Sequence, residues 1–395
     1  MKKLSLIFCL IILSFLLPGC SEPAWQGWSG FTAYDGLIYF GTMDGRVLAM
    51  NASARSQGLS FPSEGEWALP VKTPAPAGGM CGPIGCASPV QPATIYATPV
   101  VADSLVYVTT YAGDNGKVIA INRLAPGYDE EGIPSWNEGE WFYPRKENKF
   151  IGAIVASPAV VEGTLYLGSS DGKLYALDAV TGKEKWAPFD TGGKIWTSPV
   201  FEGGVVYVSN YEQKFFAVSG TDGGLLWEIE LPATVSSSPV IYGESIYFGT
   251  FGRNLCSIAI SDGSEKWKFE GGNWFWATPL VKDGVVYAGC LDHNIYAIDA
   301  STGKELWRFT ADDQIVSTPV LAGNLLVAAS RSGVIYILEL DSGTLVRSAS
   351  VGFQVMSPLC AEENTVYVHA RNRCVYAIDV QSGDKVWEFS YFVSE

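Results

Sequence analysis

The chain repeats itself with a period close to forty residues, and this period constrains the fold more than any other feature of the sequence. Six prolines mark it at spacings of 41, 40, 40, 40 and 39 residues: Pro158, Pro199, Pro239, Pro279, Pro319 and Pro358. Each proline opens the same succession of a short apolar segment, a glycine-containing turn, a Val-Tyr segment and an Ala-x-Asp phrase leading to tryptophan. Repeats of this length built from strands are typical of stacked or radial repeat proteins.

The repeat unit has the pattern of four short strands. Its clearest copies span 176–186, 297–307 and 377–387, weaker copies span 217–227 and 257–267, and the copy at 337–347 lacks the tryptophan. Apolar and polar residues alternate with period two, which indicates strands. Thr-Gly, Ser-Gly and Asp-Gly pairs between them favour tight turns, because glycine adopts positive φ at little cost. Four antiparallel strands in forty residues make one blade of a β-propeller.

Counting the blade openings gives eight. Two imperfect repeats, at 34–51 and 98–122, precede the regular ones, so the openings fall near Phe31 and at Pro99 and the six prolines above. We therefore predict an all-β fold, an eight-bladed β-propeller of four-stranded antiparallel blades, as one domain over 30–395 with inserts at about 52–95 and 123–150. A closed ring leaves only short, protected sheet edges, and the alternative, an open β-solenoid, needs a much shorter rung.

Five tryptophans recur at one place in the outer strand: Trp186, Trp227, Trp267, Trp307 and Trp387. An aromatic ligand site is the functional interpretation. Packing between neighbouring blades is the structural one, and it explains better why the same position recurs in different blades.

The first twenty residues resemble an export signal. Lys2 and Lys3 precede an apolar run over 4–17, which is too short for a membrane-spanning helix. The run ends in Leu-Pro-Gly-Cys, similar to a bacterial lipobox, so we expect a lipoprotein signal peptide at 1–19, lipidation of Cys20 and a linker over 20–29. The alternative is an ordinary secretory signal in which Cys20 is a bystander.

The composition fits a globular protein outside the cytoplasm and argues against a nucleic-acid partner. The chain has 395 residues, 48% of them hydrophobic, which is ample for a large core. The formal net charge is −15, and no basic cluster is available to neutralise phosphates. An acidic surface is also repelled by anionic lipids, so a lipid chain is the expected membrane tether.

Two segments depart from the period. Between Trp67 and Pro99 the chain is about twenty residues longer than in the regular blades, and this insert is rich in proline and glycine. Cys81 and Cys86 bracket a Gly-Pro-Ile-Gly turn within it, and a disulfide between them is expected in an oxidising compartment, the alternatives being free thiols or a metal site. A second, acidic insert at about 123–140 falls between the two outer strands of the second blade.

Aromatic residues recur three positions before several blade openings. Trp28, Tyr96, Trp196 and Trp276 occupy this position, Trp274 lies two residues earlier, and the other blades have Val155, Ser236, Val316 and Val355 there. Innermost strands line the channel of a propeller, so their starts surround one mouth. These aromatics either form a funnel that binds an apolar peptide or a flat ligand, with the cysteine-bearing insert overhanging it, or fill the channel as packing.

The phrase Ala-x-Asp-x-x-Thr-Gly-x-x-x-Trp, repeated every forty residues, resembles the repeat of quinoprotein (PQQ-type) eight-bladed propellers over roughly residues 30–390. With the lipobox and the length, the chain is most similar to the BamB-like lipoproteins of outer-membrane assembly. The dehydrogenase branch of such propellers holds PQQ with Ca²⁺ under a disulfide between adjacent cysteines. This chain has no adjacent cysteine pair and no Cys-x-x-Cys-His motif, so we expect no cofactor.

Other catalytic chemistry finds little support in the sequence. His293 and His369 have no spacing typical of a metal site or a catalytic triad, and Cys256, Cys290, Cys360 and Cys374 are interpreted as buried strand residues. We therefore expect a non-catalytic scaffold, anchored by lipid at the outer face of a bacterial membrane, that binds envelope proteins or peptides as a monomer or as a subunit of a hetero-complex. The alternatives are a PQQ-dependent dehydrogenase with a divergent site and a ligand-binding or sensory propeller.

Overall fold

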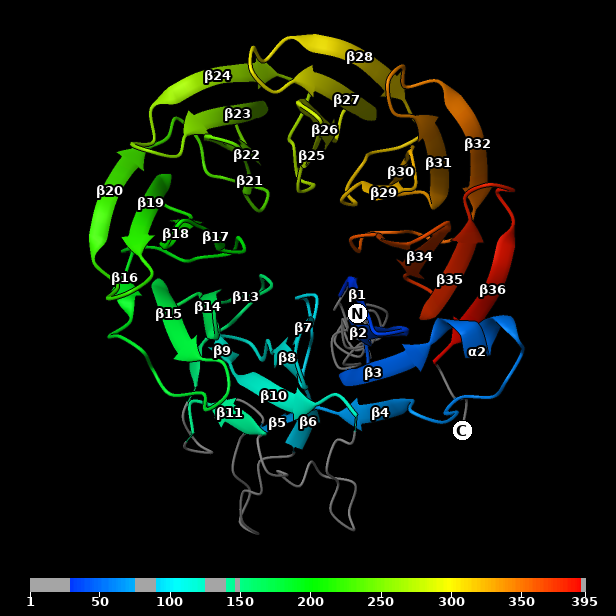
Figure 1. The fold of residues 1–395 in the computed structure, drawn as a ribbon, viewed down its shortest axis with the longest axis horizontal. Coiled ribbons are helices and arrows are strands. Elements are labelled where there is room, and N and C mark those ends of the chain that lie inside the picture. The colour runs from blue at the N-terminus through cyan, green and yellow to red at the C-terminus, as the bar shows by residue number, and fades with distance from the viewer. Residues whose placement is uncertain (1–28, 75–89, 125–139, 146–149, 392–395) are drawn as a thin grey trace, which may run out of the picture.

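The computed structural model describes residues 29–74, 90–124, 140–145 and 150–391 and shows a ring of eight four-stranded antiparallel sheets around a central axis (Figure 1). The predicted fold class and blade number are confirmed. Cys20, Trp28, Cys81 and Cys86 lie outside the described residues, so the predictions that rest on them stay predictions.

Every blade is built from strands that follow one another along the chain. The first four blades comprise β1 (Phe31–Tyr34), β2 (Leu37–Gly41), β3 (Arg46–Asn51) and β4 (Trp67–Pro70); β7 (Val100–Ala102), β8 (Leu105–Thr109), β10 (Val118–Asn122) and β11 (Trp141–Tyr143); β13 (Ala159–Val161), β14 (Thr164–Gly168), β15 (Lys173–Asp178) and β16 (Phe189–Asp190); and β17 (Val200–Glu202), β18 (Val205–Ser209), β19 (Lys214–Ser219) and β20 (Leu225–Glu230). The last four comprise β21 (Val240–Tyr242), β22 (Ser245–Gly249), β23 (Asn254–Ala259) and β24 (Glu265–Glu270); β25 (Leu280–Lys282), β26 (Val285–Gly289), β27 (Asn294–Asp299) and β28 (Glu305–Thr310); β29 (Val320–Ala322), β30 (Leu325–Ala329), β31 (Val334–Glu339) and β32 (Leu345–Ser350); and β33 (Cys360–Glu362), β34 (Thr365–Ala370), β35 (Cys374–Asp379) and β36 (Lys385–Ser390).

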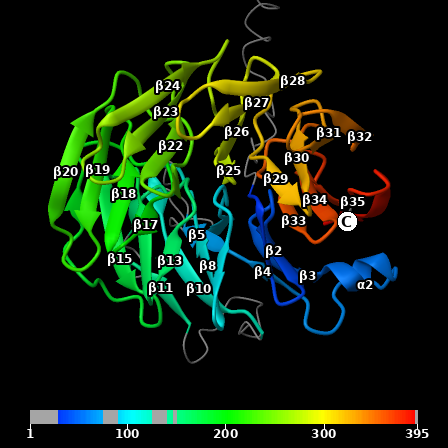
Figure 2. The ribbon, with the colours of Figure 1, turned by 45° about the horizontal axis from the view of Figure 1, so that its top comes forward.

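The antiparallel order gives the ring two distinct faces. Each innermost strand begins at one face, which also carries the turn between the second and third strands and the connection to the next blade; we call this the mouth face. The opposite face carries the turns between first and second strands and between third and fourth strands. Figure 2, tilted from the view of Figure 1, shows the blades as inclined sheets arranged around the central axis.

The inserts lie where the period is interrupted. Helix α2 (Ala52–Ser56) follows β3 and lies at the outer rim beside β36 (Figure 1). Arg55 of this helix forms a buried ion pair with Glu66, with Arg55 Nη2 and Glu66 Oε2 2.9 Å apart. Strands β5 (Lys72–Pro74) and β6 (Val90–Pro92) pair at the base of the cysteine-bearing insert, and β9 (Asn115–Gly116) pairs with β12 (Ile151–Gly152). Among the described residues, no helix is long and apolar enough to cross a membrane.

Neighbouring blades are joined by a tyrosine and a tryptophan that share one acceptor. At four interfaces the phenol of the second strand and an indole in or just before the outer strand both donate to one backbone carbonyl of the next blade, at 2.9–3.3 Å. The pairs and their acceptors are Tyr107 and Trp141 on Ala179, Tyr166 and Trp186 on Gly220, Tyr247 and Trp267 on Ala300, and Tyr287 and Trp307 on Leu340. We call this arrangement the Tyr–Trp clamp.

The clamp explains why the repeat requires glycine in its Thr-Gly turn. Gly303 has φ +70°, and a Cβ there would lie 2.7 Å from the Trp267 ring of the preceding blade. Gly223 has the same relation to Trp186, and Gly263 to Trp227. The glycine is therefore needed both for the turn and for the close approach of the indole. Trp387, in the last blade, is likewise buried.

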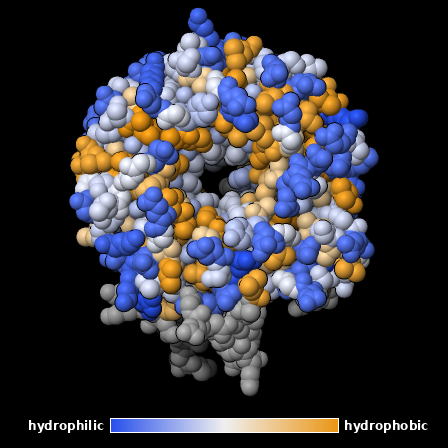
Figure 3. All heavy atoms as spheres, in the orientation of Figure 1, coloured by the Kyte–Doolittle hydropathy of each residue, from blue (hydrophilic) through white to orange (hydrophobic). Residues whose placement is uncertain are grey.

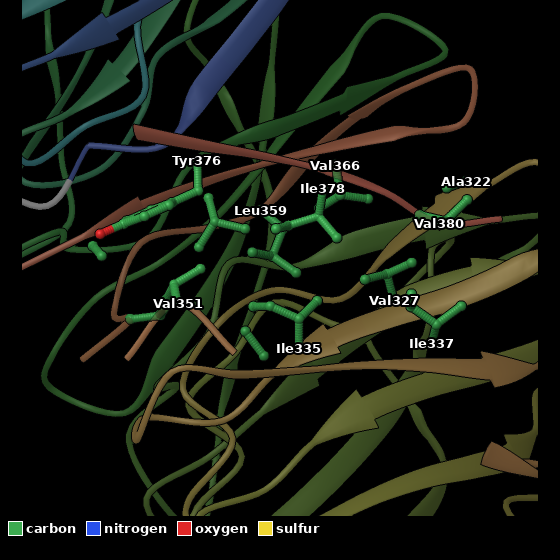
Figure 4. Close-up of a cluster of buried hydrophobic side chains, with 14 residues drawn as sticks. Ala322, Val327, Ile335, Ile337, Val351, Leu359, Val366, Tyr376, Ile378 and Val380 are labelled. Carbon is green, nitrogen blue, oxygen red and sulfur yellow. The ribbon is translucent and has the colours of Figure 1, made fainter. Parts of the chain in front are cut away.

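The interface between the seventh and eighth blades lacks the clamp. Val327 replaces the tyrosine, and Arg347 replaces the tryptophan, its side-chain stem lying over Gly383. An aliphatic cluster fills this interface instead, and it includes Ile335, Leu359 and Val366 (Figure 4). The aliphatic cluster therefore takes the place of the tryptophan that the 337–347 repeat lacks.

The ring closes between the eighth and first blades without a shared strand, since β1–β4 and β33–β36 form separate sheets. His369 joins the two ends: its Nδ1 lies 3.1 Å from the Ser29 carbonyl oxygen and its Nε2 2.8 Å from the Tyr391 hydroxyl. Complete burial lowers the pKa of His369 to about 4. Arg46 adds a bond from Nη2 to the Tyr391 carbonyl at 2.6 Å. The closure thus depends on side-chain contacts.

Candidate binding surface at the channel mouth

A channel opens at the centre of the ring, as Figure 3 shows. Its throat is lined by the residues that precede each innermost strand, and most of them carry hydroxyl groups: Thr98, Ser157, Ser198, Ser238, Thr278, Thr318 and Pro358. Backbone amides of one blade donate to the hydroxyls of the next, Thr98 N to Ser157 Oγ at 3.0 Å and Ser198 N to Ser238 Oγ at 3.1 Å. The cavity has a volume of about 190 Å³.

A second ring of residues surrounds the throat towards the mouth face. Tyr96, Trp196 and Trp276 line the channel there together with Val155, Ser236, Val316 and Met356. The sequence-based assignment of Val355 to this ring is wrong, because β33 begins two residues after Pro358 whereas the other regular blades begin one residue after their proline. Pro358 therefore takes the throat position of Thr318, Met356 takes the mouth position, and Val355 is fully buried.

Five aromatic residues form a continuous arc across the mouth face of the fourth, fifth and sixth blades. Ring centroids lie 4.9 Å apart between Trp196 and Tyr211, 6.5 Å between Tyr211 and Phe251, 4.9 Å between Phe251 and Trp274, and 5.8 Å between Phe251 and Trp276. We call these five residues the aromatic arc. Trp274 does not line the channel, but Phe251 connects it to Trp276 and, through Tyr211, to Trp196.

The arc is exposed rather than packed. Trp196, Tyr211, Trp274 and Trp276 keep 45%, 43%, 41% and 42% of their surface accessible. Side chains that fill a channel as core would be largely buried, so these values favour the interpretation of the arc as a surface that meets something outside the ring. Tyr96 lies apart from the arc and packs edge-on against Tyr111, with centroids 5.1 Å apart.

Sequence reasoning missed Tyr211 and Phe251, although a signal was present. Both follow the second strand of their blade by two residues, and they are 40 residues apart. Leu291, Arg331 and Arg371 continue the same register. The mouth face therefore changes from aromatic to basic around the ring, a variation that only comparison of turn positions between repeats would have found.

The channel does not fit PQQ with Ca²⁺, the group that the fold family implies. The described residues that line it have hydroxyl, aliphatic and aromatic side chains, and none of them is charged. Calcium requires several oxygen ligands, usually including carboxylates, and an acidic quinone requires cationic partners. Within the described ranges, no three His, Cys, Asp or Glu side chains are grouped as metal ligands would be.

The described cysteines, His293 and Asp292 lie in environments that indicate structural roles. Burial raises the pKa of the Cys256 and Cys290 thiols to about 12 and that of Cys360 to about 11, so these thiols are protonated at neutral pH. His293 adopts φ +75° in its turn. Asp292 accepts hydrogen bonds from the Tyr296 hydroxyl and the Gly272 amide, both at 2.7 Å, and so stabilises the turn between β26 and β27.

The ring, its clamps and its throat define an eight-bladed propeller of the PQQ-repeat class. The family model described as outer membrane protein assembly factor BamB matches residues 22–189, 187–290, 274–346 and 291–391. The chain therefore belongs to this family, as its repeat predicted.

Individual relatives are distant. The outer membrane protein assembly factor BamB of Nitrosomonas eutropha is 27% identical over 124 residues, which are 31% of this chain and 27% of that relative. The crystal structure of BamB from Moraxella catarrhalis superposes with a TM-score of 0.63 at 14% identity, covering 86% of this chain and 92% of the other. The computationally designed Ika8 protein superposes with a TM-score of 0.66 at 15% identity, covering 93% and 98%. The two structures show a shared fold.

Proposed function

We propose that this protein is a lipid-anchored, non-catalytic scaffold that takes part in the assembly of outer-membrane proteins. The observation that carries the proposal is the family match, which extends over the whole described propeller. The lipobox-like sequence ending in Cys20 supports anchoring by an acyl chain. The hydroxyl-lined throat and the high thiol pKa values support a role in binding rather than catalysis.

The physical mode that we propose for a protein partner is strand addition at a blade edge. The outermost strand of each four-stranded blade is paired on its inner side, so its outer edge offers backbone donors and acceptors. Among the five regular six-residue outer strands, β32 carries one charged residue, Arg347, while β20, β24, β28 and β36 each carry two or more. Charges protect exposed edges from pairing, and β32 has the least of this protection.

Affinity capture of the native lipoprotein from its own envelope, with identification of what copurifies, tests the proposal. We expect a component of the outer-membrane β-barrel assembly machinery to copurify with the wild type. Val346→Lys, which places a charge on β32, should lower its recovery about fivefold, the effect of about 1 kcal/mol.

The matched control is Val386→Lys on β36. The two valines occupy corresponding strand positions and are similarly exposed, 39% for Val346 and 46% for Val386. This control should leave recovery unchanged. Equal losses in both variants would contradict docking on β32, and the absence of any assembly component from the wild-type capture would contradict the scaffold role.

A further inference from the structure

We propose that the aromatic arc binds the interface of a phospholipid bilayer, so that the propeller stands with its mouth face towards the membrane that anchors it. The inference rests on the proposed lipid anchor at Cys20 and names what the arc contacts. The mouth face thereby becomes the membrane side of the ring, and the blade edges are left to protein partners.

The first support is the place where the chain enters the ring. Ser29 and Gly30 precede β1, whose start lies at the mouth face. A Cβ on Gly30 would lie 2.6 Å from Thr98 Oγ1 and 3.1 Å from Pro358 Cβ, and both of those residues line the throat. The described chain therefore begins beside the channel, on the face that carries the arc.

The second support is the length of that segment. Only eight residues separate Cys20 from Ser29, and this stretch spans at most about 32 Å when fully extended. To reach the opposite face around the rim, a chain must cross a blade width of about 15 Å and a strand height of about 20 Å. The extended tether falls just short of this route around the rim, which favours the mouth face on the bilayer.

The third support is the chemistry of the arc. Tryptophan and tyrosine gather at membrane–water interfaces because their rings are apolar and their N–H or O–H groups are polar. Trp196 has this character: its ring is exposed, and its Nε1 donates to Ser170 Oγ at 2.9 Å. Lys194 extends over the same ring, 5.8 Å from its centroid, as an interfacial lysine would.

The distribution of exposed aromatics distinguishes a mouth-on from an edge-on orientation. Away from the mouth face, the exposed aromatic side chains of the described residues are Tyr34 and Tyr242. They belong to the first and fifth blades and form no cluster. Because the tether alone also permits the rim to meet the membrane, the arc is what selects the mouth.

Charge determines which lipids suit this contact. Glu212 and Asp292 lie in mouth-face turns near the arc and the whole chain is acidic, whereas Arg331 and Arg371 lie in the corresponding turns of the seventh and eighth blades, so anionic headgroups are not favoured at the arc itself. The contact that we propose is therefore with zwitterionic headgroups and is driven by burial of the aromatic rings. It should depend weakly on salt.

Quenching of tryptophan fluorescence by brominated lipid tests the inference on the lipidated full-length chain. The protein is incorporated into phosphatidylcholine vesicles whose acyl chains are brominated near the headgroup, and its emission is compared with that in unbrominated vesicles. Both proteins carry Trp25→Phe and Trp28→Phe, because the tether would hold these two tryptophans near the lipid in any orientation. We expect clear quenching of the otherwise wild-type protein, and quenching about threefold smaller when Trp196→Ala, Trp274→Ala and Trp276→Ala are combined in it.

Tyr242→Ala is the control, because Tyr242 is 42% exposed on the opposite face. The tryptophan fluorescence of the Tyr242→Ala variant should be quenched as strongly as that of the wild type. Thermal unfolding should show the combined variant folded, because none of its three indoles is buried.

The possible negative results distinguish failure of the membrane contact from failure of the scaffold role. An unquenched wild type, or equal quenching in the combined variant, would overturn the membrane contact. A combined variant that is quenched like the wild type but loses the copurifying partner would also overturn it, and would assign the arc to a polypeptide instead. The mass of the N-terminal peptide reports lipidation separately, and a Cys20 without lipid would also overturn the inference. A wild type that is quenched but captures no assembly component would overturn the scaffold role alone.

Discussion

Replacing Trp267 by alanine should destabilise the propeller by about 3–5 kcal/mol, the usual cost of removing a buried aromatic ring. The indole is 8% exposed, packs against Gly303 of the next blade and donates to the Ala300 carbonyl at 2.9 Å. Tyr247 donates to the same carbonyl at 3.1 Å, so the acceptor keeps one partner after the substitution. The loss therefore reports packing between the fifth and sixth blades, and urea unfolding measures it.

Two further variants identify the source of this loss. Trp267→Phe keeps a ring over the turn but removes the N–H donor, and it should cost about 1–2 kcal/mol. Trp276→Ala removes an indole of the same region that is 42% exposed, and it should change stability by less than about 0.5 kcal/mol. If Trp276→Ala cost as much as Trp267→Ala, our separation of clamp residues from arc residues would be wrong.

The stability of the ring should fall on mild acidification because of His369. Its folded pKa of about 4 lies below the ordinary value of 6.5, so the unfolded chain binds the proton more strongly than the folded one. The stability that this neutral histidine contributes is fully present above pH 6.5 and is lost as the pH falls towards 4. The full difference corresponds to roughly 3 kcal/mol, of which about 2 kcal/mol should be lost between about pH 7.5 and pH 5.

Comparison with His369→Gln isolates this contribution from the carboxylates that also titrate in acid. Glutamine does not titrate, so the variant should lose about 2 kcal/mol less than the wild type over the same pH interval. Chemical unfolding at several pH values gives both slopes. Parallel slopes would show that His369 is not held neutral between Ser29 and Tyr391.

The fold could be predicted because its information is local and repeated. Proline before each inner strand, Thr-Gly in the outer turn and tryptophan after it recur every forty residues, and each has one physical role in the blade. The recurrence predicted eight blades and packing of Trp186 and Trp267 between them. It also placed the acidic insert between β10 and β11, where the structure has it.

The other structural features depend on how the repeats differ from or contact one another, which the forty-residue period does not show. Trp141 is a clamp residue, but the acidic insert separates it from its turn and conceals the repeat phrase. Pro358 is shifted by one position relative to Pro319, which moved the assigned mouth residue from Met356 to Val355. Closure by His369 joins residues at the two ends of the chain, and no local pattern indicates such a contact.

The candidate site was predicted in part. The spacing before the blade prolines identified Trp196, Trp274 and Trp276 as mouth-face aromatics. Their joining into one surface depends on Tyr211 and Phe251, which extend from turns of other strands. A surface assembled from two kinds of loop requires the three-dimensional arrangement of the blades, because neither loop alone carries the pattern.

The function that we propose for this propeller is support of the assembly of outer-membrane proteins. The most direct measurement is the amount of folded β-barrel protein in the outer membrane of its own host, with the gene intact, deleted, and restored as wild type. We expect the folded amount to fall on deletion and to recover with the wild-type gene. Equal amounts of folded barrels with and without the gene would contradict it.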